Sequence, residues 1–367
     1  MPAFYITAAF LACFLQCLTS GFAQEPPTEA PISINEDPLT DDRSGDSKHN
    51  NKSQGLRRAV KLESVVSDIL FPDNEVVSFR LNKEDHRKTV ALALGGGGVR
   101  GASHIGVLRA FERAHVKIDF IAGCSMGAII GALYAAGVPL DQIEEFMTDK
   151  SELKKACLPL PLALKTMVAM SANVRPGHSR LVGIYSGDKI ARFIDAKVPE
   201  DRRELQNTKI KFVAFSANLL DGKSYAITGG DIGKAVQASS AVPFLYRPVA
   251  TIDGRLFVDG GVRANVPVYT AKMAGADVTI AVTADEELRE LEPSKVEGLF
   301  RLLDRATNMA VAETNHDQSK FADFEIRPEM PAVSHISHRI SDVKAAIVAG
   351  ESAANKLIPQ IKARLEP

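Results

Sequence analysis

Short apolar runs alternate with segments of helical periodicity along most of the chain. Short apolar runs bounded by turn residues suit buried strands, and apolar residues three and four positions apart suit amphipathic helices. Strands are expected at 89–94, 119–122, 210–216, 224–228, 248–252, 256–258 and 277–282, and helices at 102–114, 126–136, 187–196, 233–239, 267–274, 296–313 and 341–365. This alternation predicts an α/β fold with three α/β/α layers and a mainly parallel central sheet. The Asp253-Gly254 turn adds at least one antiparallel pair.

The first 23 residues have the features of a secretory signal peptide. An apolar stretch spans residues 6–18, and small residues occupy the −3 and −1 positions of a cleavage site after Ala23. We therefore expect export to the periplasm or secretion. No Lys or Arg precedes the apolar stretch. The alternatives are an uncleaved anchor, for which the stretch is too short, and a lipid anchor at Cys17, disfavoured because Gln16 stands where a small residue is wanted.

The remainder of the chain divides into three parts. Residues 24–58 combine four prolines, clustered Ser, Asn and Asp, and no aromatic residue, which predicts a disordered acidic linker. Residues 59–87 are expected to form a helical extension, because apolar residues within 59–70 follow helical spacing. Residues 88–367 are expected to form the main domain.

Composition narrows the classes of function. The chain has 44 Lys+Arg and 45 Asp+Glu, a formal net charge of −1, which disfavours a nucleic-acid partner held by bulk positive charge. Outside the signal segment only Cys124 and Cys157 remain, so a disulfide scaffold is excluded and both are expected to be small buried side chains. No metal-binding motif is present, and neither a metal nor a cofactor is expected.

The first candidate motif is a glycine cluster between a strand and a helix. Gly96, Gly98 and Gly101 satisfy the G-x-G-x-x-G spacing of dinucleotide sites. That interpretation is disfavoured because Asp119 opens the second strand, whereas the ribose-binding carboxylate belongs at the end of that strand. Consecutive unshielded N–H groups at a helix start remain suited to an anion or a developing oxyanion.

The second motif is Gly123-Cys124-Ser125-Met126-Gly127, which matches G-x-S-x-G at a strand-to-helix turn. Such a turn projects the Ser125 hydroxyl from the sheet as a nucleophile and leaves the N–H of Met126 free for an oxyanion. The alternative is that Ser125 merely caps the following helix.

The third motif is Asp259-Gly260-Gly261, directly after a strand. A carboxylate there can face a nucleophile on a neighbouring strand, or it can simply form a turn. If the base is instead a histidine, as in the Ser-Asp-His order, the candidates are His316, His335 and His338.

Together these motifs resemble the patatin-like phospholipase family. The segments GGGVRG (96–101), GCSMG (123–127) and DGG (259–261) are similar to its oxyanion segment, nucleophile elbow and catalytic aspartate motif. ASSAVP at 238–243 is similar to its A-S-x-x-x-P block. All four stand in the family's order, and the resemblance covers about residues 88–365. It implies that the main domain, residues 88–367, is a patatin-like catalytic domain, nearest to the compact bacterial type.

The resemblance implies a Ser125–Asp259 dyad that forms an acyl-enzyme without a cofactor or catalytic metal. It implies that the oxyanion segment acts through the N–H groups of Gly97 and Gly98, with Arg100 supporting the loop. The implied oxyanion-hole residues are Gly96, Gly97, Gly98, Arg100, Gly101 and Met126. The implied glycines of the elbow and aspartate motifs are Gly123, Gly127, Gly260 and Gly261.

The expected activity is that of a lipid acyl hydrolase acting on phospholipid, lysophospholipid or another acyl ester. The apolar segment 157–170 is interpreted as a lid or a surface for peripheral membrane contact, as a core helix, or as a dimer surface. Two alternative functions stay open: a non-catalytic lipid-binding or regulatory protein of the same fold, and a triad esterase. The oligomeric state is undetermined by the sequence.

Overall fold

The structure is a computed structural model of the chain. It describes residues 69–70, 81, 87–149, 183, 185–243, 245–251, 254–285, 288, 290–297, 299–330, 333, 335, 337 and 339–366. The predictions for the signal peptide, the linker, segment 157–170 and Cys157 lie outside these residues, as does most of the expected helical extension.

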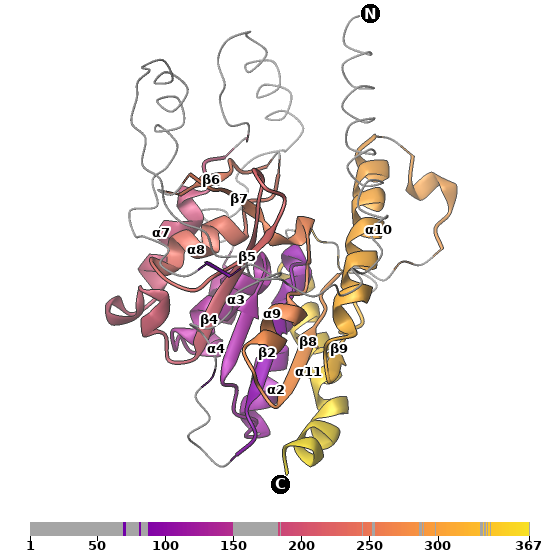
Figure 1. Cartoon of the computed structure of the whole chain (residues 1–367). Coiled ribbons are helices and arrows are strands. Elements are labelled where there is room, and N and C mark those ends of the chain that lie inside the picture. Colours follow the sequence, from indigo (N-terminus) through magenta and orange to yellow (C-terminus); the bar gives the residue numbers. More distant parts are fainter. Residues whose placement is uncertain are drawn as a thin grey trace, which may run out of the picture. The chain divides into compact units, whose positions relative to one another are not determined.

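A nine-stranded sheet forms the centre of the described fold (Figure 1). Its main path runs β1-β5-β4-β3-β2-β8-β9, with β7 paired to β4 and β6 paired to β7. The parallel part consists of β4 (Lys211–Asn218), β3 (Phe120–Gly123), β2 (Val90–Leu94), β8 (Val278–Val282) and β9 (Phe324–Ile326). The antiparallel pairs add β1 (Ile69–Leu70), β5 (Ser224–Ile227), β6 (Val249–Ala250) and β7 (Leu256–Asp259).

Helices cover both faces of the sheet. Successive side chains of a strand point to opposite faces, so both faces carry apolar side chains that must be buried. On β2, Leu92 and Leu94 pack into the larger core with α2 and α11, whereas the smaller Ala91 and Ala93 face α9. The helices are α2 (Ser103–Arg113), α3 (Met126–Ala135), α4 (Leu140–Thr148), α7 (Asp188–Lys197), α8 (Ile232–Ser239), α9 (Val268–Met273), α10 (Leu299–Ser319) and α11 (Ile340–Leu365). Short 3-10 helices occupy Gly98–Ala102, Glu200–Arg202, Leu205–Asn207, Gly260–Val262 and Pro293–Lys295. The expected α/β/α fold with a mainly parallel sheet is confirmed.

The expected strands and helices of the main domain are all present, most with shifts of one or two residues at their ends. The largest shift is that of α10, which ends at Ser319 and not at residue 313. β6 pairs antiparallel with β7, as the sequence predicts, and Gly254 has a φ of 88°. Asp253, the other residue of the predicted turn, lies outside the described residues. The helix expected over residues 59–70 is wrong at its last two residues, which form β1. Pairing with the edge of β5 determines the conformation of Ile69 and Leu70. The hydrogen bonds that an open sheet edge offers to the backbone outweigh the helical preference of the local sequence.

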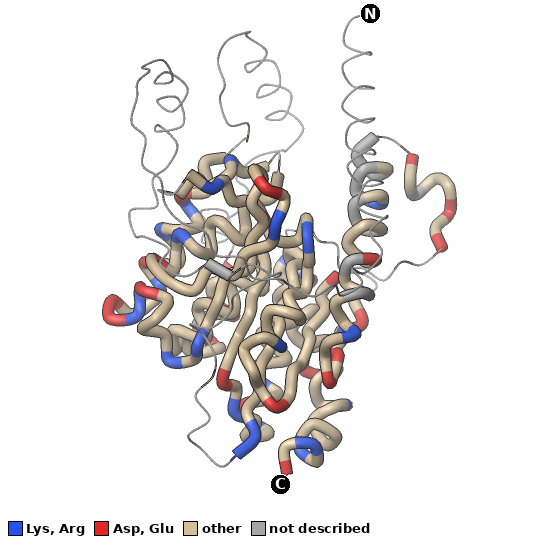
Figure 2. The backbone as a smooth tube through the Cα atoms, in the orientation of Figure 1, with Lys and Arg blue, Asp and Glu red and all other residues tan. Residues whose placement is uncertain are grey.

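The helix α4 and the edge strand β9 have no counterpart among the predicted elements. Cys124 is buried, as expected. Figure 2 shows basic and acidic residues interspersed over the described backbone, in keeping with the formal net charge of −1. None of the helices in the described part combines the length and apolarity needed to cross a bilayer.

Candidate active site

Ser125 stands at the turn between β3 and α3, at the carboxyl end of the parallel strands. Its φ of 52° and ψ of −119° lie in a region that residues with a side chain seldom adopt. Such a conformation costs of order 1–3 kcal/mol and persists only where the surroundings enforce it. The turn is tight: an ideal Cβ at Gly123 would lie 2.6 Å from the carbonyl oxygen of Gly127, and one at Gly127 would overlap that of Leu94. Both glycines of the predicted elbow are therefore required by packing.

Asp259 is the last residue of β7, and its side chain is buried beside Ser125. The Gly261 N–H donates to its Oδ1 at 2.8 Å, and the Cys124 thiol lies 3.7 Å from the same atom. Burial raises the pKa of Asp259 to about 6, although hydrogen bonds from Gly261, Ser125 and Cys124 oppose the shift. A carboxylate with that pKa, bonded to the serine hydroxyl, can accept its proton near neutral pH.

The glycine loop after β2 lies against Ser125, since an ideal Cβ at Gly96 would be 3.0 Å from the Ser125 Cβ. The N–H of Gly96 donates to the backbone oxygen of Asn265 at 3.1 Å. By contrast, the N–H groups of Gly97, Gly98 and Met126 have no acceptor among the described residues. These three N–H groups are thus the ones suited to bind an oxyanion. Gly96 has a different role, because its lack of a side chain lets the loop lie close to Ser125.

The remaining glycines are also tightly packed. Gly98 has a φ of 54°, and a Cβ there would overlap the backbone oxygen of His335. An ideal Cβ at Gly101 would lie 2.5 Å from the Met126 Cγ, and one at Gly260 would lie 2.6 Å from the backbone oxygen of Phe215. Gly261 places its N–H on Asp259.

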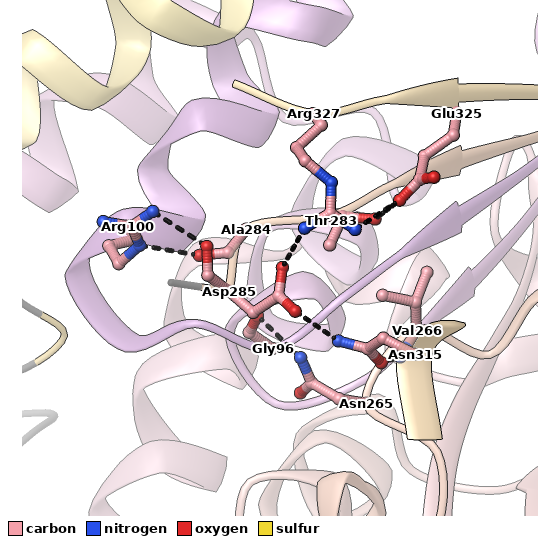
Figure 3. Close-up of polar contacts among 10 residues, drawn as sticks. All are labelled: Gly96, Arg100, Asn265, Val266, Thr283, Ala284, Asp285, Asn315, Glu325 and Arg327. Carbon is pink, nitrogen blue, oxygen red and sulfur yellow. Dashed lines mark hydrogen bonds and ion pairs between the residues drawn. The ribbon is translucent and has the colours of Figure 1, made fainter. Parts of the chain in front are cut away.

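Arg100 is buried, and its guanidinium group donates hydrogen bonds to backbone oxygens (Figure 3). Its Nε donates to Ala284 at 3.0 Å and its Nη2 to Asp285 at 2.8 Å. Its Nη1 donates to Met330 at 2.7 Å and to Val333 at 2.8 Å. The Arg100 side chain therefore bonds the glycine loop to the segments after β8 and β9.

A second buried network, absent from the sequence prediction, fixes the other side of the loop (Figure 3). The Asp285 carboxylate accepts from the Asn315 amide at 2.8 Å, and the Asn315 oxygen accepts from the N–H of Val266 at 3.1 Å. The preceding residue, Asn265, donates to the oxygen of Gly96 at 3.3 Å. The outer members of this network are Arg327, Glu325 and Thr283. No local sequence pattern marks these residues, because their partners come from distant segments.

The histidine alternative finds no support in the described geometry. His335 contributes its backbone oxygen to the Val99 N–H, and burial followed by the charge of Arg100 lowers its pKa to about 4. His104 is buried with Nε2 placed 2.7 Å from the Gly95 oxygen, and burial lowers its pKa to about 4. Neither ring hydrogen bonds to the Ser125 or Asp259 side chain. His338 and the side chain of His316 lie outside the described part.

The described residues contain no group of three or more His, Cys, Asp or Glu side chains placed to hold a metal ion. What the site does contain is a partly exposed serine on a strained turn, a buried carboxyl group bonded to it, and three unbonded N–H groups. This arrangement, at a strand-to-helix turn of an α/β fold, has the geometry that a serine nucleophile requires.

Comparisons with known proteins give the family. Residues 92–272 match the model described as patatin-like phospholipase. An uncharacterized NTE family protein of Mycobacterium tuberculosis is 33% identical over 224 residues, covering 60% of this chain and 56% of the relative. The lysophospholipase NTE1 of Pyricularia oryzae is 28% identical over 221 residues, covering 59% of this chain and 14% of the relative. The chain thus carries a domain of the patatin-like phospholipase family.

The chain spans about half the length of the mycobacterial relatives it matches and a small part of the fungal one. Among solved structures, VipD from Legionella pneumophila has 15% sequence identity and a TM-score of 0.42, covering 75% of this chain and 67% of that chain. The type III effector ExoU has 15% identity and a TM-score of 0.36, covering 76% of this chain and 54% of that chain.

Proposed function

We propose that this protein is a lipid acyl hydrolase that cleaves carboxylic esters through Ser125 and Asp259. The observation that carries the proposal is the buried Asp259 carboxyl group, bonded to the hydroxyl of a serine held at positive φ. Three backbone N–H groups without acceptors beside that serine add the means to stabilise negative charge.

In the first half of the reaction, the Ser125 Oγ attacks the ester carbonyl carbon and Asp259 takes the hydroxyl proton. The N–H groups of Gly97, Gly98 and Met126 stabilise the oxyanion of the tetrahedral intermediate. The intermediate collapses to an acyl-serine ester, and the leaving alcohol receives the proton from Asp259.

In the second half, Asp259 accepts a proton from water while the water oxygen attacks the acyl-serine carbonyl carbon. Collapse of this second tetrahedral intermediate releases the fatty acid and returns the proton to the Ser125 Oγ. Because one carboxylate serves both halves, no histidine is needed, and the burial of Asp259 supplies the basicity that an exposed carboxylate lacks.

We propose phospholipids or lysophospholipids as the substrate class. The family match supports acyl lipids in general, and relatives named lysophospholipase NTE1 favour the lysophospholipid end of this range. We further propose that residues 1–23 direct export, on the signal-like pattern of the sequence.

Turnover by the mature protein of a short-chain p-nitrophenyl ester, a lysophospholipid and a diacyl phospholipid tests the proposal. Wild type is expected to be active, with Ser125→Ala and Asp259→Asn each losing at least 10³-fold in kcat. Ser341→Ala and Asp141→Asn, both exposed, serve as matched controls and keep wild-type rates. Wild-type inactivity on all three esters, with lipid binding retained, would instead support a non-catalytic lipid-binding protein.

The triad alternative predicts a different pattern among the same variants. Under it, substitution of His316, His335 or His338 would abolish turnover while Asp259→Asn would retain it. The dyad predicts that Asp259→Asn is inactive, and that the His316 and His338 variants stay active.

A further inference from the structure

The A-S-x-x-x-P block does not enter the proposed chemistry, yet its two serines contact the nucleophile's backbone. Ser239 ends α8 and Ser240 caps it, and both side chains are buried. The Ser239 Oγ lies 3.2 Å from the N–H of Ser125 and accepts from it. The Ser240 Oγ donates to the carbonyl oxygen of Ser125 at 3.3 Å. The peptide groups on both sides of the Ser125 Cα are thus held by one short segment.

The next residue of that segment holds the proposed base. The backbone oxygen of Ala241 accepts from the N–H of Asp259 at 3.0 Å. Three consecutive residues, 239–241, therefore bond to the backbones of both Ser125 and Asp259. Since Ser125 follows β3 and Asp259 ends β7, a shared partner of this kind fixes their separation.

The Ser239 hydroxyl has a fixed orientation. Its proton is donated to the Phe215 oxygen on β4 at 2.6 Å, which leaves its lone pairs for the Ser125 N–H. No other acceptor for that N–H is present among the described residues, whereas the Ser125 oxygen also accepts from Ala128 and Ile129 in α3. Ser239 is therefore the more critical of the two serines.

We propose that residues 239–241 form a positioning strip, in which Ser239 above all holds Ser125 in its positive-φ conformation at the distance from Asp259 that proton transfer requires. The inference rests on the proposed function. The strip touches neither the substrate nor the reacting atoms, so Ser239 and Ser240 are positioning residues. Losing the strip is expected to slow the chemical step while leaving substrate binding intact.

The test compares Ser239→Ala and Ser240→Ala with wild type in the same protein and on the same esters as above. Ser239→Ala is expected to lower kcat at least tenfold with KM within twofold of wild type, and Ser240→Ala is expected to lower kcat less. Ser224→Ala changes a buried serine on β5 that has no hydrogen bond to Ser125 or Asp259 among the described contacts; it is the matched control and is expected to keep the wild-type kcat. A wild-type kcat in the Ser239→Ala variant would overturn the inference.

Hydrogen–deuterium exchange of the Ser125 amide gives a second readout that needs no turnover. In Ser239→Ala this amide is expected to exchange at least tenfold faster than in wild type or Ser224→Ala. If wild type hydrolyses no ester, the proposed function fails, and the exchange rate alone then decides whether the strip holds the turn. Unchanged exchange in Ser239→Ala overturns the strip even when wild type is active.

Discussion

At the scale of single residues, Asp259 combines a proposed catalytic role with a cost to stability. Its carboxyl group is buried and its hydrogen-bond donors are Gly261, Ser125 and Cys124, none of which carries a positive charge. Burial therefore dominates and raises its pKa to about 6 from a usual value of 3.8. The buried carboxylate is therefore a stronger base than an exposed aspartate. Keeping it ionised also lowers the stability of the folded state.

The first prediction concerns the acid limb of the activity. Because Asp259 must be ionised to accept the Ser125 proton, kcat/KM is expected to fall about tenfold per pH unit below about pH 6. A pH–rate profile on a neutral ester measures this. An acid limb near pH 4 would contradict the burial-raised pKa.

The second prediction concerns stability. Because the pKa of Asp259 is higher in the folded state than in the unfolded state, proton binding to its carboxyl group favours folding. This contribution to stability is fully present below the unfolded value of 3.8 and is lost as the pH rises through about 6. Asp259→Asn is thus expected to be more stable than wild type at pH 8 by up to about 3 kcal/mol, with the gain vanishing near pH 3.5. Urea unfolding at both pH values checks this, with Asp141→Asn as the exposed control.

At the scale of elements, helix α11 depends on a close crossing with α2. An ideal Cβ at Gly350 would overlap the Ser103 oxygen, and one at Gly106 would overlap the Ile347 oxygen. Two glycines, one on each helix, let the backbones approach, and Ala346 and Ile347 are buried at the same contact. The crossing places α11 on the same face of the sheet as α2, the helix that follows the glycine loop.

The third prediction follows from that crossing. In an open helix, Gly→Ala adds up to about 1 kcal/mol of stability. Gly350→Ala is instead expected to destabilise by about 1–3 kcal/mol, because the new Cβ would meet backbone that cannot move independently. Gly131→Ala is the matched control, since its Cβ would meet only side-chain atoms at 3.1 Å and beyond. Equal unfolding free energies for the two variants would contradict the crossing geometry.

The glycine loop is the second element whose position depends on distant segments. Arg100→Lys removes the planar fork that reaches four backbone oxygens, and a lysine cannot satisfy them all. We expect a loss of about 3 kcal/mol in unfolding free energy and a fall in kcat as the loop loosens. Arg113→Lys, with a side chain 65% exposed, should change neither quantity measurably.

At the scale of the whole molecule, the order of strands and helices in the main domain could be predicted because each depends on local apolar periodicity. The edge strand β9 could not be, since three residues carry too little pattern and only pairing with β8 makes them a strand. Segment 59–70 shows the reverse case, because a helical pattern ends in two residues that pair with β5.

The final prediction also concerns the whole chain. If residues 1–23 act as a signal peptide, the exported protein begins at Gln24, because Gly21 and Ala23 supply the small residues that the cleavage site requires. Intact-mass and N-terminal analysis of protein from the extracytoplasmic fraction measures this. Ala23→Arg should block cleavage at that bond, whereas an unchanged start in that variant would contradict the assigned site.

The sequence by itself determined the α/β alternation, the placement of Ser125 on a strand-to-helix turn and the candidate role of Asp259, because these follow from local pattern and motif. Only the tertiary structure decided that, among the described residues, the N–H groups of Gly97, Gly98 and Met126 have no acceptor while that of Gly96 does. It also decided that Arg100 binds backbone 184 to 233 residues further along the chain, and that Ser239 bonds to Ser125. Hydrogen-bond partners of this kind are set by which distant segments the sheet and its helices bring together, and no local pattern encodes that.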